Sequence, residues 1–401
     1  MRIGIVGNGL AGIMAAKALR ELGCQGEIEI FARERHHYYP RPNLIDYLAG
    51  TLPQERVFAF PEAWYEKQRL GIHLGAAVEK ISTDTLELST GDGPGARFDT
   101  LLLCDGATAA VPPVRGIDHK GVFTLRTLDD AQSILDYLPG HPEVAVIGGG
   151  LLGLEIGRAL NLRGARVRVV EYFDRLLPRQ LDAEGADLLK SWIERMGLRV
   201  RLGASVEEVS GPGEASGLRL KDGEEIAASL IVLAAGVKPN IRLARAAGLE
   251  TDQGLVVNDR LQTSHPKIFA AGDNISHRGR LYGIIPAAFA QARIAAANLL
   301  GPAQTYDGTV PSNMLKVAGL FVASTGQVQP QGPGFEIFHK LDRDRGIYKK
   351  IVLQDGLLVG AIWMGTRQGA AEVIKAVAGR RADHPWNDAM LEDDFDYGLL
   401  Q

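Results

Sequence analysis

Two stretches of this chain share one pattern of apolar and polar positions. In each, a short run of mostly β-branched residues is followed by glycines and then by a segment rich in Ala, Leu and Ile. An apolar run of this length is typical of a strand buried in a parallel sheet, and the segment after it predicts a helix. The copies span residues 2–22 and 144–162. We therefore expect the chain to build one strand–turn–helix unit twice.

The rest of the chain alternates strand and helix patterns as far as residue 300 and then changes character. This alternation predicts an α/β protein. After residue 308 the pattern becomes that of antiparallel strands at residues 309–325, 335–340, 346–353 and 357–364, followed by a helix at 368–378. Earlier strands are expected at residues 27–31, 100–104, 166–170, 198–202, 229–235 and 255–257, with a hairpin around Ile81 and Leu86 and helices at 62–71, from Thr127 onward, and 286–300.

Each of the repeated turns has the spacing G-x-G-x-x-G. The first glycine permits a tight turn, the second lets the backbone approach a pyrophosphate, and the third lets helix and strand pack closely. The helix N-terminus offers free N–H groups and a partial positive charge to the anion. One such turn is weak support, because glycine turns occur in many folds. Two of them, each with its own strand and helix, indicate two bound dinucleotides and electrons passing between them.

The second strand after each turn ends differently. In the second copy it ends at Glu171, where a carboxylate would accept hydrogen bonds from both ribose hydroxyls and repel a 2'-phosphate, which favours NADH over NADPH. Arg175 and Arg179 lie nearby and would attract a phosphate. The first copy has Ala32 at this position, so we assign the ribose to Glu34; the alternative is a solvated Arg–Glu cluster.

Composition and charge narrow the function classes. The 401 residues suffice for two or three domains, and the net charge of -4 gives no electrostatic case for a nucleic-acid partner. No apolar run reaches the roughly 18 residues of a membrane span, and charged residues at 17, 20 and 21 interrupt a signal-peptide pattern, so we expect a cytoplasmic protein. The 2 cysteines, Cys24 and Cys104, are far apart, which argues against a local redox pair and a zinc site. We interpret both as structural thiols.

Three further segments suggest a flavin. Residues 36–44 are aromatic, cationic and rich in proline, and can wall a planar redox ring; the alternative is a surface loop whose aromatics cover the core. Asp273, just after a predicted strand, would suit the polyol chain of a flavin, and the helix at 286–300 could direct its N-terminus at a ring carbonyl. The acidic and aromatic residues 383–401 form either a flexible tail or a clasp.

The chain resembles the pyridine nucleotide-disulfide oxidoreductase superfamily of flavoproteins over nearly its whole length. The residues that carry the resemblance are the paired glycine turns and residues 125–131, 234–240 and 263–273. The resemblance implies two Rossmann-like dinucleotide-binding domains and a small α+β C-terminal domain. Its domains would be an FAD-binding domain at residues 1–110 and 237–308, an NAD(H)-binding domain at 111–236, and an interface domain at 309–401.

The resemblance also assigns site residues and no metal. Arg41, Pro42, Glu155 and Lys316 would lie near the flavin and nicotinamide, with Glu155 positioning the nicotinamide amide and the two cations stabilising the reduced ring. For Glu155 the alternative is an acid that satisfies a helix N-terminus, and for the two cations it is surface ion pairing. The implied FAD ligands are Gly7, Gly9, Leu10, Ala11, Gly12, Glu34, Arg41, Gly106, Gly272, Asp273, Pro286 and Ala287. The implied NAD ligands are Gly148, Gly150, Leu151, Leu152, Gly153, Glu155, Glu171 and Gly236.

Three features favour the rubredoxin and ferredoxin reductases within the superfamily. Residues 43–47 lack the redox cysteine of the disulfide and peroxide reductases, which argues against reduction through a thiol. Arg41-Pro42-Asn43-Leu44 is similar to the R-P-x-L of ferredoxin and rubredoxin reductases, and the following Asp46 is closer to rubredoxin reductases. Residues 176–182 and 311–319 are similar to segments of NADH:rubredoxin reductases and of the flavin module of NADH-dependent nitrite reductases.

The resemblance thus implies an NADH oxidoreductase that passes hydride to FAD and then single electrons to a small acidic or neutral iron protein, such as rubredoxin or ferredoxin. Flavin accepts two electrons and releases them singly, so no protein nucleophile is needed. Two alternatives stay open: a flavin reductase module of an NADH-dependent nitrite reductase system, and a redox-switched flavoprotein that regulates a partner without useful turnover. A monomer or homodimer is expected, with neither nucleic acid nor membrane as a partner.

Overall fold

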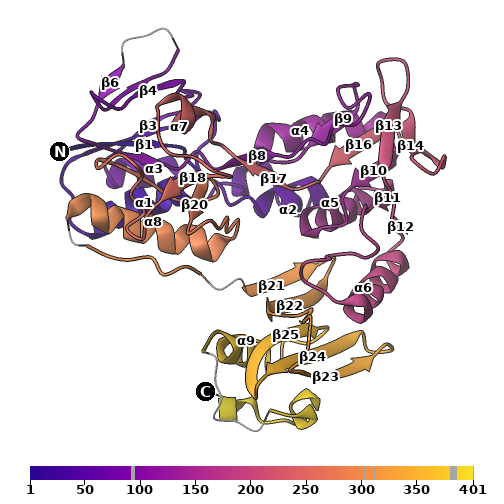
Figure 1. Cartoon of the computed structure of the whole chain (residues 1–401). Coiled ribbons are helices and arrows are strands. Elements are labelled where there is room, and N and C mark those ends of the chain that lie inside the picture. The colour runs from indigo at the N-terminus through magenta and orange to yellow at the C-terminus, as the bar shows by residue number, and fades with distance from the viewer. Residues whose placement is uncertain (92–94, 302, 310–311, 380–385, 401) are drawn as a thin grey trace. The chain divides into compact units, whose positions relative to one another are not determined.

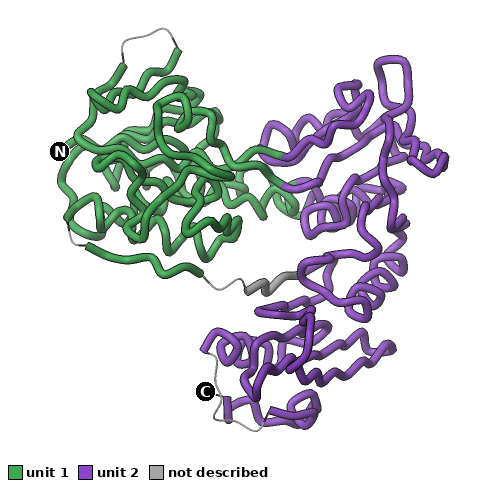
Figure 2. Tube along the Cα trace, viewed as in Figure 1, with its two compact units in different colours: residues 1–47, 51–109, 237–309 green, residues 48–50, 110–236, 310–401 purple. Residues whose placement is uncertain are grey.

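Each glycine turn follows the central strand of a five-stranded parallel sheet. The structure is a computed structural model that describes residues 1–91, 95–301, 303–309, 312–379 and 386–400, with the backbone alone for residues 312–316 (Figure 1). The chain divides into two compact units (Figure 2). Unit 1 contains residues 1–47, 51–109 and 237–309, and unit 2 contains residues 48–50, 110–236 and 310–401.

The sheet of unit 1 contains the first glycine turn. Helices α1 (Leu10–Glu21) and α8 (Ile285–Leu300) pack against each other beside it, and the side chains of Ile3 and Ile5 are fully buried. The strand order is β19-β7-β1-β2-β3. These strands are β1 (Arg2–Val6), β2 (Glu27–Phe31), β3 (Leu70–His73), β7 (Thr100–Leu103) and β19 (Ile268–Ala270).

Smaller elements complete unit 1. The antiparallel sheet β4-β5-β6 lies in the chain between β3 and β7. Strand β8 pairs with β17 next to the points where the chain leaves unit 1 and returns to it, and β18 pairs with β20 later in the chain. The elements are α2 (Asn43–Ala49), α3 (Glu62–Lys67), β4 (Lys80–Ser82), β5 (Glu87–Ser89), β6 (Ala96–Arg97), β8 (Ala107–Ala109), β17 (Val237–Pro239), α7 (Arg242–Ala246), β18 (Leu255–Val257) and β20 (Ile275–His277).

The sheet of unit 2 repeats the first sheet strand for strand. Its order, β9-β16-β10-β11-β12, places β10 where the first sheet has β1, and the antiparallel sheet β13-β14-β15 precedes β16 in the chain as β4-β5-β6 precedes β7. The outer strand differs in chain order, since β9 comes before β10 whereas β19 comes after β7. The repetition seen in the turns therefore extends to the whole domain, which confirms the predicted pair of Rossmann-like domains. The elements are β9 (Val122–Thr124), α4 (Leu128–Tyr137), β10 (Glu143–Ile147), α5 (Leu151–Leu162), β11 (Arg166–Val170), α6 (Ala183–Arg195), β12 (Arg199–Arg201), β13 (Val206–Ser210), β14 (Gly217–Leu220), β15 (Glu225–Ala227) and β16 (Leu230–Leu233).

The C-terminal part of unit 2 is a five-stranded antiparallel sheet covered by a helix, which confirms the predicted small α+β domain. The sheet order is β21-β22-β25-β24-β23. Its core contains Trp363 and Ile351 from the sheet and Val373 from the helix. The elements are β21 (Ser312–Val317), β22 (Leu320–Gly326), β23 (Phe335–Asp342), β24 (Ile347–Gln354), β25 (Leu357–Met364) and α9 (Ala370–Gly379).

A buried ion pair joins this sheet to the nucleotide-binding part of unit 2. Asp182 caps the N-terminus of α6 by accepting from the Gly185 amide, and its other oxygen accepts from Lys350 Nζ and the Tyr348 hydroxyl, both at 2.7 Å. Burial acts to raise the pKa of Asp182, but the hydrogen bonds from Lys350 and Tyr348 outweigh it and hold the pKa below its usual value.

Three sequence predictions of element bounds were wrong. The helix predicted at residues 62–71 ends at Lys67, because Arg69 adopts a φ of 50° and the following residues pair with β2 as strand β3. Leu86, with a φ of 54°, lies in the turn before β5 rather than in a strand. The strand predicted at residues 309–325 is two strands, since Ala318 and the next residue form a tight turn with φ values of 48° and 87°.

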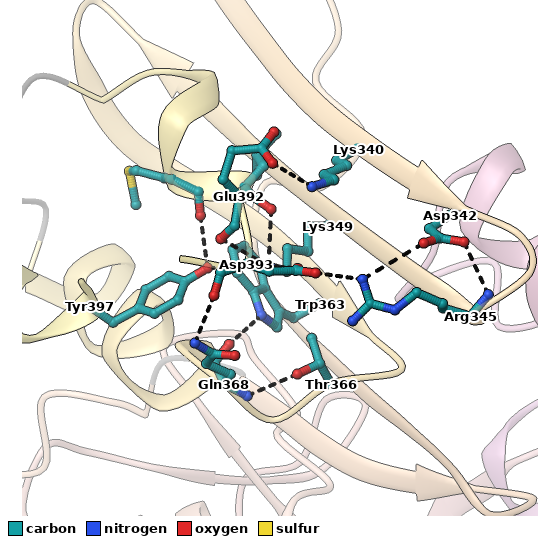
Figure 3. Close-up of polar contacts among 12 residues, drawn as sticks. Lys340, Asp342, Arg345, Lys349, Trp363, Thr366, Gln368, Glu392, Asp393 and Tyr397 are labelled. Carbon is teal, nitrogen blue, oxygen red and sulfur yellow. Dashed lines mark hydrogen bonds and ion pairs between the residues drawn. The ribbon is translucent and has the colours of Figure 1, made fainter. Parts of the chain in front are cut away.

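The described part of the acidic tail, residues 386–400, is a clasp rather than a flexible tail (Figure 3). Lys349, on β24, is only 1% exposed, and its ammonium donates to the carbonyls of Leu391 at 3.0 Å and Glu392 at 3.4 Å. The same nitrogen lies 3.3 Å from Asp393 and 5.4 Å from the centre of the Trp363 ring. The tail side chains that pack into the domain core are Trp386, Met390, Leu391, Tyr397 and Leu400. Residues 383–385 and 401 of the predicted tail lie outside the described residues.

Among the residues that the structure describes, no helix combines the length and the apolar character that crossing a bilayer requires.

Replacing Lys349 with Met should weaken the clasp and destabilise the C-terminal domain by about 2–4 kcal/mol, because buried carbonyls and a carboxylate lose their donor. Thermal unfolding followed by limited proteolysis of the tail measures this. The matched control is Lys340→Met, on the neighbouring strand β23. This variant removes an exposed ion pair with Glu392 and should leave stability nearly unchanged. Equal stability of the two variants would contradict a buried ammonium that holds the tail.

Candidate functional site

The first glycine turn leaves open space at the N-terminus of α1. Gly7 has a φ of +108°, and a Cβ atom on Gly12 would lie 2.0 Å from the Gly7 carbonyl oxygen, so neither position tolerates a side chain. In contrast, a Cβ atom on Gly9 would meet nothing within 4 Å. Among the described residues no side chain caps α1. Its first N–H groups are therefore available to an anion, as the binding of a pyrophosphate requires.

The second turn has the same construction. Gly148 has a φ of +120°, a Cβ atom on Gly153 would lie 1.9 Å from the Gly148 carbonyl oxygen, and the position of Gly150 is open. No side chain in the described part of the chain caps α5, which begins at Leu151. Leu152, in its first turn, is exposed. The chain thus presents two equivalent cradles for a dinucleotide.

The first cradle gathers predicted site residues from three adjacent strands. The turn after β1 touches the end of β7, because a Cβ atom on Gly7 would lie 2.2 Å from the Cys104 carbonyl oxygen. It also touches the segment after β19, because a Cβ atom on Gly272 would lie 3.0 Å from that of Ala11. Gly272 donates its amide to Gln291 on α8 at 2.9 Å. The remaining predicted residues there are Leu10 in α1, Gly106 after β7, Asp273 after Gly272, and Pro286 and Ala287 in the first turn of α8.

Two buried amide oxygens in this region have no partner among the described residues. They are Oδ1 of Asn8, in the glycine turn, and Oδ1 of Asn274, after Asp273. Buried polar atoms normally find a hydrogen-bond partner. Acceptors left unsatisfied beside an open glycine cradle fit the hydroxyl groups of a bound nucleotide. The residues present therefore fit a flavin dinucleotide.

Glu34 and Arg41 pair with each other. Arg41 Nη2 lies 2.5 Å from Glu34 Oε1, and the hydroxyl of Tyr39 hydrogen-bonds both residues. Burial acts to lower the pKa of Arg41, but the hydrogen bond to Glu34 outweighs it and raises the pKa above its usual value. Pro42 follows at the start of the turn into α2. The structure thus brings together two predicted site residues as a half-buried ion pair.

Glu171 is fixed against the second turn. Its carboxylate is buried and accepts from the Gly149 amide through Oε2 and from the Phe173 amide through Oε1 at 2.8 Å. Arg175 is directed elsewhere, since it donates to Asp174 at 2.9 Å and to Gln329 at 2.7 Å. The segment after β16, which contains Gly236, begins beside this turn, because a Cβ atom on Gly148 would lie 2.5 Å from the carbonyl oxygen of Ala234.

Glu155 lies one turn into α5 and accepts from the Ala318 amide at 2.6 Å. Trp192 on α6 donates to the Ala318 carbonyl at 3.1 Å. The turn between β21 and β22 is therefore held by two helices of the nucleotide-binding part. Lys316 is on β21, but its side chain lies outside the described residues.

Asp105 and Asn274, in the first cradle, were not among the site residues predicted from the sequence. Asp105, after β7, is half-buried, and its Oδ1 accepts from Asn274 Nδ2 at 2.9 Å. Burial raises the pKa of Asp105 to about 7. The available signal was the internal repeat, since the chain has Cys104-Asp105-Gly106 after β7 and Ala234-Ala235-Gly236 after the equivalent β16.

The cysteines are both buried and both free thiols. Burial raises the pKa of the Cys104 thiol well above its usual value, which suppresses the reactive thiolate. In the described part of the chain, no group of three or more His, Cys, Asp or Glu side chains is arranged to hold a metal ion.

Known proteins are similar to this chain in sequence and in structure. Over 95% of its length the chain is 34% identical to the assimilatory nitrate reductase electron transfer subunit of Bacillus subtilis, and it covers 49% of that protein. It is also 34% identical to the rubredoxin-NAD(+) reductase of Ectopseudomonas oleovorans, over 75% of this chain and 80% of the relative. The crystal structure of NADH:rubredoxin oxidoreductase from Clostridium acetobutylicum matches with a TM-score of 0.84 and 27% identity, over 97% of this chain and 98% of that one. The chain thus spans about half the length of the nitrate reductase subunit.

Family models cover both the nucleotide-binding residues and the C-terminal domain. Residues 311–380 match a model described as the rubredoxin NAD+ reductase C-terminal domain. Residues 1–292 match one described as pyridine nucleotide-disulphide oxidoreductase. The resemblance noted in the sequence is therefore confirmed: the chain belongs to the pyridine nucleotide-disulphide oxidoreductase family, and this membership implies the use of FAD and a nicotinamide nucleotide.

Proposed function

We propose that this chain is an NADH-dependent FAD oxidoreductase that delivers single electrons to a small iron protein of the rubredoxin or ferredoxin type. The observation that carries the proposal is the pair of equivalent cradles, at Gly9 and Gly150, in a chain whose cysteines are both buried. FAD, when bound, supplies the chemistry that links a two-electron hydride donor to a one-electron acceptor.

We assign FAD to the first cradle and NADH to the second. The first site has contributions from three strands and from α8, and its unpartnered Asn8 and Asn274 oxygens suit a ligand that stays bound. The second site is simpler and uses Glu171 for the ribose hydroxyls. In each site the N–H groups at the start of the helix hold the pyrophosphate. Arg41 and Lys316 serve as flavin-side cations in this proposal, and Glu155 positions the nicotinamide amide.

The preference for NADH over NADPH is supported by the surroundings of Glu171. A 2'-phosphate placed at this ribose would meet a buried carboxylate that two backbone amides hold in place. Arg175, the cation that could offset this repulsion, is already engaged by Asp174 and Gln329, and Arg179 is exposed. Like charges at hydrogen-bond distance disfavour binding, so NADH is the better donor.

The nature of the acceptor is supported by the relatives. The rubredoxin-NAD(+) reductase relative is covered over most of its length, and the C-terminal domain matches that of rubredoxin NAD+ reductases. A second candidate is a flavin module that serves nitrite reduction. It is favoured by 35% identity to a Bacillus subtilis nitrite reductase, of which this chain covers 45%.

We expect purified protein to be yellow, to hold FAD, and to oxidise NADH rapidly only when an iron protein is added. An acceptor panel of rubredoxin, a ferredoxin and a nitrite reductase catalytic module, each assayed with NADH, measures this. Rubredoxin-dependent turnover would support the main proposal. A colourless protein that FAD cannot reconstitute would contradict it. Slow flavin reduction, a long-lived charge-transfer complex and no acceptor-dependent rate would instead favour the redox-switched regulator.

Stopped-flow reduction of the bound flavin should be at least about tenfold more efficient with NADH than with NADPH, equivalent to about 1.4 kcal/mol. Glu171→Gln should narrow this ratio, because the charge that repels a 2'-phosphate is gone. Glu207→Gln, an exposed carboxylate of the same domain, is the control and should leave the ratio unchanged. Equal rates with both donors in the unaltered protein would mean that Glu171 does not set the preference.

Replacing Cys24 and Cys104 together with Ala should leave NADH-dependent acceptor reduction within about twofold of the original rate, since buried thiols act as small apolar side chains. Steady-state assays with matched flavin content test this. Complete loss of activity in a protein that still holds FAD would revive a thiol mechanism.

A further inference from the structure

The two cradles differ in charge-bearing chemistry at a position that touches the glycine turn. A Cβ atom on Gly7 would lie 3.1 Å from the backbone nitrogen of Asp105, and one on Gly148 would lie 3.5 Å from that of Ala235. Each residue follows the strand next to the turn and precedes a glycine of positive φ. Asp105 and Ala235 therefore hold the same place in the repeated fold, and the first cradle has a carboxyl group where the second has a methyl group.

Little positive charge surrounds the carboxyl group of Asp105. Its partner is an amide, because Asn274 Nδ2 donates to Oδ1 at 2.9 Å and also donates to the Leu103 carbonyl at 3.0 Å. Asn274 is fully buried, and its own Oδ1 has no partner among the described residues. Within the described part of the chain, no basic side chain forms an ion pair with Asp105.

The charged and titratable groups around Asp105 are few. Arg33, after β2, is exposed and acts on Asp105 at longer range, the Cys104 thiol precedes it on β7, and Asp273 precedes its partner Asn274. Burial raises the pKa of Asp105 to about 7, against the opposing effects of its own backbone amide, of Arg33 and of the Asn274 hydrogen bond. The backbone of Asp105 lies beside the pyrophosphate-binding turn, and burial brings the pKa of its carboxyl group close to neutral pH.

We propose that Asp105 binds a proton when FAD occupies the first cradle, so that retention of FAD depends on pH while binding at the second cradle does not. The proposal rests on the assignment of FAD to this site. An ionised Asp105 would repel the two negative phosphates, whereas the protonated acid offers them a neutral neighbour and a hydrogen-bond donor. At the equivalent place the second cradle has Ala235, whose side chain does not titrate.

The direction of the pH dependence follows from linkage. Phosphates beside Asp105 favour its protonated form, so FAD raises the pKa of Asp105 above the value in the flavin-free chain. The affinity for FAD is then greatest below the flavin-free pKa of about 7 and falls as the pH rises through and above that value.

Dilution of the FAD-loaded full-length chain at pH 6, 7, 8 and 9, with released flavin followed by its fluorescence, measures the dissociation constant. We expect this constant to increase on the order of tenfold between pH 6 and pH 9. Asp105→Ala, which copies the second cradle, and Asp105→Asn should both give a nearly flat profile. Asp84→Asn, an exposed carboxylate in the turn between β4 and β5, is the matched control and should keep the original profile.

Calorimetric titration of the flavin-depleted chain with FAD at pH 8, in two buffers of different ionisation enthalpy, gives a second readout that does not depend on the variants. The unaltered chain should take up about 0.4 proton per FAD, as the pKa shift of about one unit behind a tenfold change in affinity requires. A flat pH profile or the absence of proton uptake would overturn the role of Asp105, as would an unchanged profile in a folded Asp105→Ala variant. Failure to bind FAD at any pH would instead contradict the proposed function itself.

Discussion

The close approach of helix to strand at each glycine turn is the constraint on which both nucleotide-binding domains depend. The Cα atoms of Gly12 and Gly153 face the carbonyl oxygens of Gly7 and Gly148 so closely that a single methyl group would overlap them. This contact seats α1 and α5 directly at the carboxyl ends of β1 and β10, and so directs each helix N-terminus at the space beside the middle glycine. The remaining strands of each sheet then take the same order around it.

Local patterns were sufficient to predict most of the fold. The strands at Glu27–Phe31 and Arg166–Val170 have the predicted bounds, and Thr127 caps α4 as its position before two acidic residues indicated. The failures have two causes. Arg69 and Leu86 adopt positive φ values that their side chains do not prefer, so these turns follow from tertiary pairing of the flanking strands. The turn at Ala318 contains Gly319, a glycine signal that the prediction of one continuous strand did not use.

The sequence predicted the glycine cradles but not the contacts that their acidic residues make. The sequence left ion pairing open as the alternative for both Glu34 and Arg41. It did not indicate that they pair with each other, because that depends on how residues 36–40 turn between them. Asp105 was overlooked because it stands after an apolar strand without a motif, and its meaning comes from the comparison with Ala235 at the equivalent position. Internal repeats allow such a comparison within one chain, since a departure from the repeat marks the place where the two halves have different tasks.

The strand pair β8–β17 has a consequence for how the chain is assembled. Ala107–Ala109 and Val237–Pro239 run antiparallel, and the Ala110 amide donates to the Gly236 carbonyl just beyond them, so both ends of the intervening residues 111–235 leave from one point. Strand β19, which completes the first sheet by pairing with β7, emerges from the ribosome only after that whole segment. The first sheet therefore lacks its last strand while the second sheet is synthesised. Because the ends of the inserted segment are adjacent, its own folding closes the long loop and brings β19 within reach of its partner with little further loss of chain entropy.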